Sequence, residues 1–465
     1  MKRTLAIYIV LIATLLGATP YLTGMLVEVK FNDVVHLISE IETIPAKINV
    51  IEYKRGWRTS IAKTEVVIYS DRGGKLKEYR FLLNHDIRHG PFVQLTDNNY
   101  RDWQFARALI HSTLQLTQSG EKVLLDEIGH TNIFNINSEF AINGAVNIAV
   151  EGPELKIKEH EGTERVAFKG LSGKWTITSD MKHINGNLIL PGMDFDLDQA
   201  RFFLGNLQYL TELNYDPQGV WPGKFHAKVE KFSVIMPNNN FSLTIDNLVT
   251  NGLINVQGTN TDLFGDCQIQ KLTFNDKEFG PIEYSNSLKH IDTQVFKSFI
   301  KLNHEIKTGQ ATHNSKVFQL MASLGPDFLK SRPEFSIDKL FVHTVNGDVQ
   351  GVFYLALGGA DINVSNLGQV MHSVLAKGEF TIPKLTLREL LIAQYSKSIN
   401  ATTEEQKAQS AQNADQIIGK WLADNMIVNK DNNYATTLEI KEGKISVNGQ
   451  LIQVPIPTQT PQVGR

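Results

Sequence analysis

The central stretch of the chain, from Asn132 to Phe274, is a succession of short runs in which apolar and polar residues alternate. Residues 241–245, Phe-Ser-Leu-Thr-Ile, are one example, and Gly, Asn and Asp separate one run from the next. Because successive side chains of a strand point to opposite faces, a period of two places the apolar residues on one face. So many runs joined by turn residues predict a long antiparallel meander with one face covered.

Strands are also expected before this region. Ile48 and Val50 alternate with polar neighbours, and the alternation resumes one residue out of phase at Ile51 and Tyr53, which predicts a β-bulge. Residues 66–69 and 79–83 read as two further strands joined by a tight turn at 71–74. Residues 101–112 fit a helix or a strand, and both interpretations stay open.

Two later stretches have apolar residues at helical spacing. Residues 287–306 and 386–425 are predicted to contain amphipathic helices, with a shorter helical piece at 317–324. Thr402-Thr403, followed by two glutamates, indicates a helix start inside the second stretch. Further strands are expected at 335–337, 340–342, 349–355, 380–383, 434–440 and 444–451, the last two joined through Glu442-Gly443. The predicted fold class is therefore α+β: an N-terminal membrane helix, then an elongated body of large twisted antiparallel β-sheets with amphipathic helices packed on one face.

The membrane helix is predicted from the first 27 residues. Lys2 and Arg3 precede a run from Thr4 to Val27 that contains no charged side chain. About 20 apolar residues suffice to cross the hydrocarbon layer, and Tyr21 is of a type enriched at membrane interfaces. The basic residues favour a cytoplasmic N-terminus, which would place the rest of the chain on the other side of the membrane.

A cleavable signal peptide is the alternative. A basic start, an apolar core and the small residues Gly17-Ala18 also fit that description, and cleavage would release a soluble exported protein. The apolar run resumes after Pro20, beyond the length that a signal core needs, so the uncleaved anchor is favoured. Residues 29–41 continue with apolar positions at helical spacing, which predicts an amphipathic extension of the anchor that Pro45 ends.

Composition excludes several classes of protein. The net charge of -3 over 465 residues, without a long Lys/Arg run in the body, gives no reason to expect a nucleic-acid partner. A mean hydropathy of -0.18 excludes a polytopic membrane protein. The single cysteine, Cys267, lies in an alternating run, so we interpret it as a strand residue in the β core rather than as a nucleophile.

Short blocks of the sequence resemble a known family. Residues 53–60, Tyr-Lys-Arg-Gly-Trp-Arg-Thr-Ser, are similar to a Tyr-x-Arg-Gly-x-x-Ser-Ser block, and residues 85–92 to an Asp-His-Gly-Pro turn. The N-terminal apolar segment and residues 443–450, Gly-Lys-Ile-Ser-Val-Asn-Gly-Gln, also match in place. These features resemble the YdgA-like family of bacterial envelope proteins, whose function is undefined. The resemblance implies an inner-membrane anchor and a periplasmic body, and the chain departs from the pattern at Thr59 and in the spacing of Asp86 and His89.

The candidate functional or structural motif lies in the first two of these blocks. Its residues are Arg55, Gly56, Trp57, Ser60, His89, Gly90 and Pro91. Arg and Trp concentrate in binding hot spots, and Trp also favours membrane interfaces, so Arg55 and Trp57 are candidates for an exposed patch. The favoured structural alternative is that Gly56 forms a β-bulge and Trp57 packs inward.

One cluster has the residue types for catalysis. His85, Asp86 and His89 could hold a metal ion or exchange protons if their side chains converged. In an extended segment, however, residues four apart are about 13 Å apart. We therefore expect Gly90-Pro91 to form a turn and His89 to hydrogen-bond across it, and we assign no catalytic residue, metal ligand or cofactor.

The predicted organisation has four parts: a signal-anchor helix at 1–27, a mostly β half at 28–275, an α+β half at 276–455 and a disordered tail at 456–465. The predicted function is that of a non-enzymatic binding or scaffold module in the periplasm, with a lipid or an envelope protein as partner and the inner membrane contacted through residues 4–27. The alternative is a periplasmic hydrolase or metal-dependent enzyme centred on His85 and His89.

Overall fold

The computed structural model describes most of the chain in two compact units. The described residues are 2–39, 46–72, 75–94, 104–116, 134–158, 165–197, 200–307, 324–358, 367–398 and 403–452. Unit 1 comprises residues 1–256 and 293–323, and unit 2 comprises residues 257–292 and 324–465. The four-part division made from the sequence stays a prediction.

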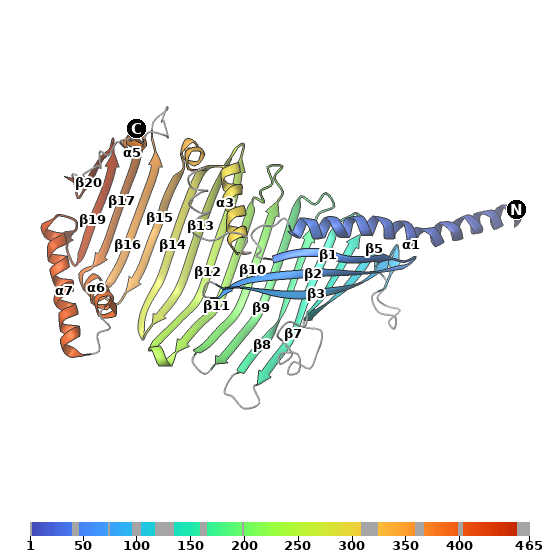
Figure 1. The fold of residues 1–465 in the computed structure, drawn as a ribbon, viewed down its shortest axis with the longest axis horizontal. Helices are drawn as coiled ribbons and strands as arrows, with labels where there is room; N and C mark the ends of the chain where they lie inside the picture. The colour runs from blue at the N-terminus through green and yellow to red at the C-terminus, as the bar shows by residue number, and fades with distance from the viewer. Residues whose placement is uncertain are drawn as a thin grey trace, which may run out of the picture. The chain divides into compact units, whose positions relative to one another are not determined.

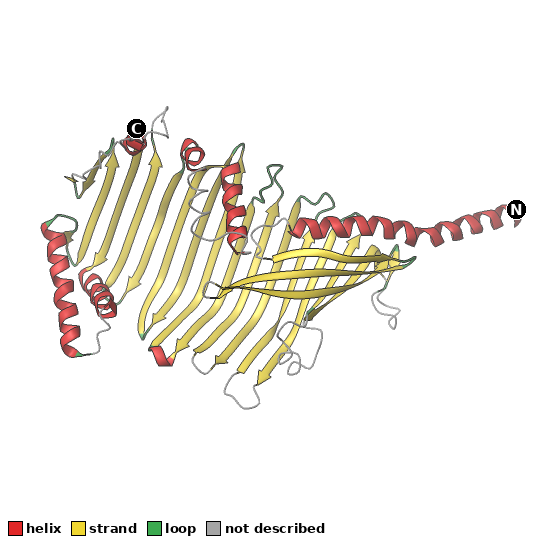
Figure 2. Ribbon diagram, viewed as in Figure 1, coloured by secondary structure: helices red, strands yellow, loops and turns green. Residues whose placement is uncertain are grey.

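Unit 1 is built on a large antiparallel meander (Figures 1 and 2). Its strands are β1 (Ala46–Arg55), β2 (Thr59–Arg72), β3 (Lys75–His89), β4 (Phe92–Val93), β5 (Gln104–Leu116), β6 (Asn135–Ala141), β7 (Val146–Lys158), β8 (Arg165–Ile177), β9 (His183–Leu197), β10 (Ala200–Asn214), β11 (Gly223–Met236) and β12 (Phe241–Gln257). Each strand pairs with the next along the chain, except that β3 pairs with β5 and the two-residue β4 lies beside β5. The alternating pattern therefore predicted this sheet correctly.

Two local predictions in this unit have clear outcomes. The β1–β2 register shifts between Val50 and Glu52, so the bulge expected from the phase slip is confirmed. Ile51 is the extra residue and its side chain is 57% exposed. The stretch at 101–112 that fitted either helix or strand is a strand from residue 104 onward, because β5 joins β3 to β6.

Helix α1 (Lys2–Ser39) supplies the core of unit 1. Its buried stripe consists of Val27, Phe31, Val34 and Leu37. The stripe packs against residues from seven strands: Ala62, Ile87, Ala108, Ile110, Phe140, Val146, Ile177 and Ile184. Burying one such side chain stabilises the fold by about 1.5–3 kcal/mol, so this stripe holds the sheet around the helix. The amphipathic extension predicted at 29–41 is confirmed as far as Ser39, whereas Pro45 lies outside the described residues.

The membrane-spanning role of this helix has a separate outcome. No helix among the residues described with their side chains is both long enough and apolar enough to cross a bilayer. The anchor predicted from residues 4–27 therefore stays a prediction.

Unit 2 is a second antiparallel meander with helices inserted into it. Its strands are β13 (Asn260–Phe274), β14 (Lys277–Asp292), β15 (Glu334–Thr344), β16 (Gly347–Leu357), β17 (Val374–Pro383), β18 (Val428–Lys430), β19 (Asn433–Lys441), β20 (Lys444–Val447) and β21 (Gln450–Ile452). Strands β13 to β17 pair in chain order, β17 pairs with β19, and β19 continues to β20 and β21, with β18 also paired to β19. Cys267 is a strand residue of β13, as expected.

The first predicted helical stretch begins too early. Residues 287–292 belong to β14, and helix α3 runs only from Thr293 to Lys307, in unit 1. Leu288 and Ile291 fit a helical period, but Leu288 pairs with Leu263 and Phe335 on the neighbouring strands. Cross-strand pairing therefore overrides the local pattern. The helical piece predicted at 317–324 lies almost wholly outside the described residues, although residues 324–330 are helical.

The second helical stretch is a helix pair in unit 2. Helix α6 (Lys384–Ser398) and helix α7 (Glu404–Ala423) follow the short helix α5 (Leu367–Ser373) and strand β17. The predicted helix start is confirmed: Thr403 caps α7, its hydroxyl accepting from the Gln406 backbone N–H and the Gln406 side chain accepting from the Thr403 N–H. Leu391, Ala414 and Ile418 form the buried contact between the two helices.

The closing hairpin is only partly as predicted. Glu442-Gly443 forms the β19–β20 turn with φ angles of 54° and 70°, which suits a two-residue hairpin loop. The strand expected at 444–451 is broken at Asn448-Gly449, a second such turn with φ angles of 50° and 77°. The predicted disordered tail lies outside the described residues.

Candidate functional site

The block Tyr53 to Ser60 forms the turn between β1 and β2. The Gly56 N–H donates to the Thr59 carbonyl at 2.8 Å. A Cβ on Gly56 would stand 2.6 Å from that oxygen, so the close approach needs glycine. The interpretation of Gly56 as a bulge is therefore wrong. The expected inward packing of Trp57 is also wrong, because the turn leaves its side chain 59% exposed.

The block His89-Gly90-Pro91 ends β3 beside this turn. The His89 N–H donates to the Arg58 carbonyl at 2.8 Å, and the ring Nε2 lies 2.9 Å from the Ser60 hydroxyl. His89 was expected to hydrogen-bond across the Gly90-Pro91 turn; its bonds go instead to Arg58 and Ser60, at the start of the adjacent strand β2. Gly90 fits tightly against β5, since a Cβ there would overlap the Ala106 carbonyl oxygen at 1.8 Å.

Both blocks meet the same turn of α1. A Cβ on Gly24 would stand 2.5 Å from the His89 ring, so glycine lets the helix lie directly on that ring. The Thr23 hydroxyl lies 3.2 Å from the Gly90 carbonyl oxygen, and 3.0 Å from the carbonyl oxygens of Thr19 and Pro20 in its own helix. We call this set the helix clasp. It comprises Tyr21, Thr23, Gly24 and Glu28 of α1 with Arg55, Trp57, Ser60, His89 and Gly90 of the sheet.

The clasp contains an ion pair that joins the sheet to the helix. The Arg55 guanidinium binds the Glu28 carboxylate at 2.7 Å and lies 5.3 Å from the centre of the Tyr21 ring. The rings of Tyr21 and Trp57 are 5.4 Å apart. Residues singled out from the two sequence blocks therefore come together, and what unites them is contact with α1.

A second buried histidine, His85 of β3, packs against a later turn of α1. The His85 ring lies 2.6 Å from the Ser112 hydroxyl and 2.8 Å from the Thr64 hydroxyl, and Phe31 of α1 packs edge-on at 5.1 Å. Burial lowers the pKa of His85 from 6.5 to about 4. Burial also lowers the pKa of His89, an effect that the carbonyls of Trp57 and Pro20 oppose.

This geometry does not favour catalysis by the histidine pair. His85 and His89 are four residues apart on one strand, about 13 Å. Both ring nitrogens of His85 are hydrogen-bonded to hydroxyl groups, whereas His89 bonds Ser60 through Nε2 and its buried Nδ1 has no hydrogen-bond partner among the described residues. Asp86 is exposed, on the other face of β3 from both rings. Within the described ranges, no group of three or more His, Cys, Asp or Glu side chains is placed to hold a metal ion. The enzyme centred on this pair stays a prediction.

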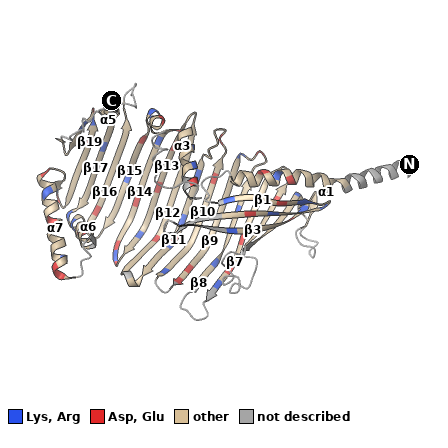
Figure 3. Cartoon of the chain, in the orientation of Figure 1, with Lys and Arg blue, Asp and Glu red and all other residues tan. Residues whose placement is uncertain are grey.

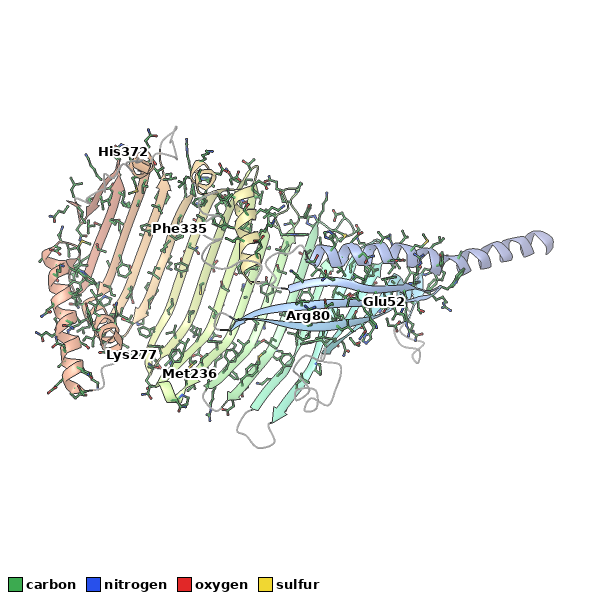
Figure 4. All side chains as sticks on the ribbon, in the orientation of Figure 1. Glu52, Arg80, Met236, Lys277, Phe335 and His372 are labelled. Atoms are coloured by element: carbon green, nitrogen blue, oxygen red, sulfur yellow. The ribbon has the colours of Figure 1, made fainter. Side chains whose placement is uncertain are left out.

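Unit 2 carries a different candidate surface, one face of its sheet. The strand registers place these apolar residues on that face: Leu263, Cys267, Ile269, Ile282, Tyr284, Leu288, Phe335, Ile337, Leu340, Val342, Val349, Phe353, Leu355, Ala376, Phe380, Leu438, Ile440, Ile445 and Val447. We call it the apolar face of unit 2; Phe335 is labelled in Figure 4. Apart from Val349, Ala376 and Val447, these side chains are partly exposed, and Leu355 is the most exposed at 37%. At the β17–β19 end of the same face, Ile382 is buried and Tyr434 packs against the α6–α7 pair.

The opposite face of the same strands carries most of the charged side chains, although Phe264, Val352, Tyr354 and Leu375 are also exposed there. It carries cross-strand ion pairs such as Lys339 with Glu283, and charges of both signs are interspersed over the strands in Figure 3. The two faces of the sheet therefore differ in composition, and the one that carries the charged side chains faces water. A face this apolar is normally covered in a folded protein, because exposed apolar area costs roughly 25 cal/mol per Å².

Aromatic rings lie flat on the apolar face because glycine stands beside them. Phe353 pairs with Gly378, and a Cβ on Gly378 would be 3.1 Å from the Phe353 ring. Phe380 pairs with Gly351 in the same way, at 2.9 Å. Rings laid over cross-strand glycines protect the backbone and keep the surface low and smooth.

Comparison with known sequences gives the family. The profile described as bacterial protein of unknown function (DUF945) matches residues 1–455, nearly the whole chain. The chain belongs to this family. Comparison with proteins of curated function finds no match.

The sequence missed the helix half of the clasp. Tyr21, Thr23 and Gly24 were predicted only as part of the anchor, and Glu28 was assigned no role. The available signal was the pair Thr23-Gly24, a polar residue and a helix-weakening one inside an apolar run. Such a pair can mark a close approach of another element to a helix.

Proposed function

We propose that this protein is a membrane-tethered bacterial envelope protein that binds the acyl chains of a lipid on the apolar face of unit 2. The observation that carries the proposal is that continuous, partly exposed apolar face. A ligand made mostly of hydrocarbon suits it, since hydrogen-bonding groups are sparse there and each buried methylene contributes about 0.8 kcal/mol.

The dimensions are compatible with this ligand. The face crosses seven strands, β13 to β17 with β19 and β20. At about 4.8 Å per strand spacing, it is roughly 29 Å wide. One acyl chain spans half of a hydrocarbon layer about 30 Å thick, so the face has room for it.

The tether is supported by residues 4–27, which carry no charge, and by the continuity of α1 from Lys2 to Ser39. Resemblance to the YdgA-like envelope proteins points the same way and suggests that the body is periplasmic. We favour binding over catalysis because the face that carries the proposal is apolar, and hydrogen-bonding groups are sparse on it.

A photoreactive fatty acid, supplied to cells that express the full chain, tests the ligand. Cells are irradiated, the protein is purified, and cross-linked peptides are located by mass spectrometry. We expect cross-links on β13 to β17. The variant Phe353→Asp should lose most of them, because a carboxylate then stands in the apolar face.

Tyr354→Asp is the matched control. Tyr354 is the next residue along β16, 39% exposed on the opposite face, so this variant should keep its cross-links. Cross-links confined to residues 4–27, or a ligand-free homodimer that buries Phe353, would contradict the proposal.

A further inference from the structure

Four aromatic side chains are exposed on α1 and on segments of unit 1 that adjoin the clasp. Tyr21 is 38% exposed, Trp57 59%, Phe92 57% and Phe105 60%. They come from α1, the β1–β2 turn, β4 and β5. Large aromatic side chains exposed together in this number indicate a contact surface.

The contacts of the clasp hold the four side chains at the same level of the helix. Tyr21 stacks on Trp57 at 5.4 Å, and Phe92, paired with Phe105 across β4 and β5, has its ring 5.3 Å from that of Phe105. The Thr23–Gly90 hydrogen bond fixes the segment that leads into Phe92 against α1. Packing therefore fixes the backbone at these residues, while their aromatic side chains stay exposed.

The basic residues of this surface are Arg55 and Arg58. Arg55 lies over Tyr21 and is paired with Glu28, whereas Arg58, exposed, follows Trp57 in the turn. Aromatic rings beside guanidinium groups match the headgroup region of a bilayer, where Trp and Tyr concentrate and where anionic lipids attract Arg.

The length of the uncharged run places a membrane boundary at this level. Counting about 20 residues from Thr4, the first after Lys2 and Arg3, reaches Thr23. At 1.5 Å per residue these span about 30 Å, the thickness of the hydrocarbon layer. The second interface then falls at Tyr21 to Thr23, the turn of α1 that forms part of the clasp.

We propose that Tyr21, Trp57, Phe92 and Phe105, together with Arg55 and Arg58, form an interfacial collar that seats unit 1 in the lipid headgroups. This inference rests on the tether in the proposed function. It adds that the body is held at the bilayer surface in one orientation rather than at the end of a free helix.

The test uses the full chain reconstituted in vesicles of phosphatidylethanolamine and phosphatidylglycerol that carry bromine high on the acyl chain. Bromine quenches tryptophan only at contact distance. We expect quenching of the wild-type fluorescence and loss of most of it in Trp57→Phe, which keeps an aromatic ring. Trp421→Phe, in α7 of unit 2, is the control and should keep the quenching.

Extraction with alkaline carbonate separates the two proposals. If the chain resists extraction but Trp57→Phe is quenched as strongly as wild type, the collar is wrong and the tether stands. Release of the wild-type chain by carbonate would remove the tether, and the collar with it.

Discussion

Acid should weaken unit 1 through His85. The ring is buried between Thr64 and Ser112 under Phe31, and burial lowers its pKa from 6.5 to about 4. In the unfolded chain the ring takes up a proton near pH 6.5, whereas in the folded chain it does so only near pH 4. The contribution of the neutral ring to stability is therefore complete above pH 6.5 and is lost as pH falls toward 4.

The magnitude follows from the two pKa values. Each unit of difference is worth about 1.4 kcal/mol, so the full shift corresponds to about 3 kcal/mol. Between pH 7.5 and pH 5, about 2 kcal/mol of the unfolding free energy should be lost through this one ring. That is a large part of the stability of an ordinary domain.

Urea unfolding of the full chain in detergent, followed at both pH values, measures the loss. His85→Gln replaces the ring with an amide that does not titrate, so the difference in pH dependence between the two proteins isolates His85 from the other histidines. The variant should be less stable at pH 7.5 and lose about 2 kcal/mol less on acidification. If both proteins lose the same free energy, the ring is not buried in its neutral form and the packing under α1 is misjudged.

Two further predictions concern helices. Gly24→Ala should destabilise unit 1 by about 1–3 kcal/mol in urea unfolding, because the added Cβ would stand 2.5 Å from the His89 ring. Gly419→Ala is the control: its added Cβ has no atom within 4 Å, so it should stabilise α7 by about 1 kcal/mol. Equal effects of the two variants would refute the close contact between Gly24 and His89. Thr403→Ala should destabilise α7 by about 1 kcal/mol, since it removes the hydroxyl that accepts from the Gln406 N–H. Hydrogen exchange of the α7 backbone amides measures this loss, and unchanged exchange rates would show that the cap contributes nothing.

Period-two alternation was enough to predict the sheet of unit 1, because a strand shows its period in a few residues. The bulge near Val50 was visible for the same reason. The start of α3 was not, because apolar residues at Leu288 and Ile291 satisfy both periods, and only pairing with β13 and β15 decides between them. The Asn448-Gly449 turn carried a clear signal that the continuous strand interpretation passed over.

The sequence predicted the residues that the sheet contributes to the candidate site, but not those that α1 contributes. The sequence blocks around Arg55 and His89 pointed to the right residues, but Trp57 was expected inside the protein. The contact of Gly24 with His89 joins residues far apart in the chain, and nothing local encodes it. The apolar face of unit 2 follows from alternation alone, but its exposure depends on what packs on it, such as the α6–α7 pair at Tyr434, which the sequence pattern does not specify.

The packing of α1 against the sheet has a consequence for the order in which unit 1 folds. The helix precedes every strand of the unit along the chain, yet its stripe packs against Ile177 and Ile184, with Leu213 and Trp221 beside them. The stripe therefore cannot reach its final partners until those strands have been translated. Docking of the helix on the sheet is thus a late, long-range event of the kind that makes folding slow.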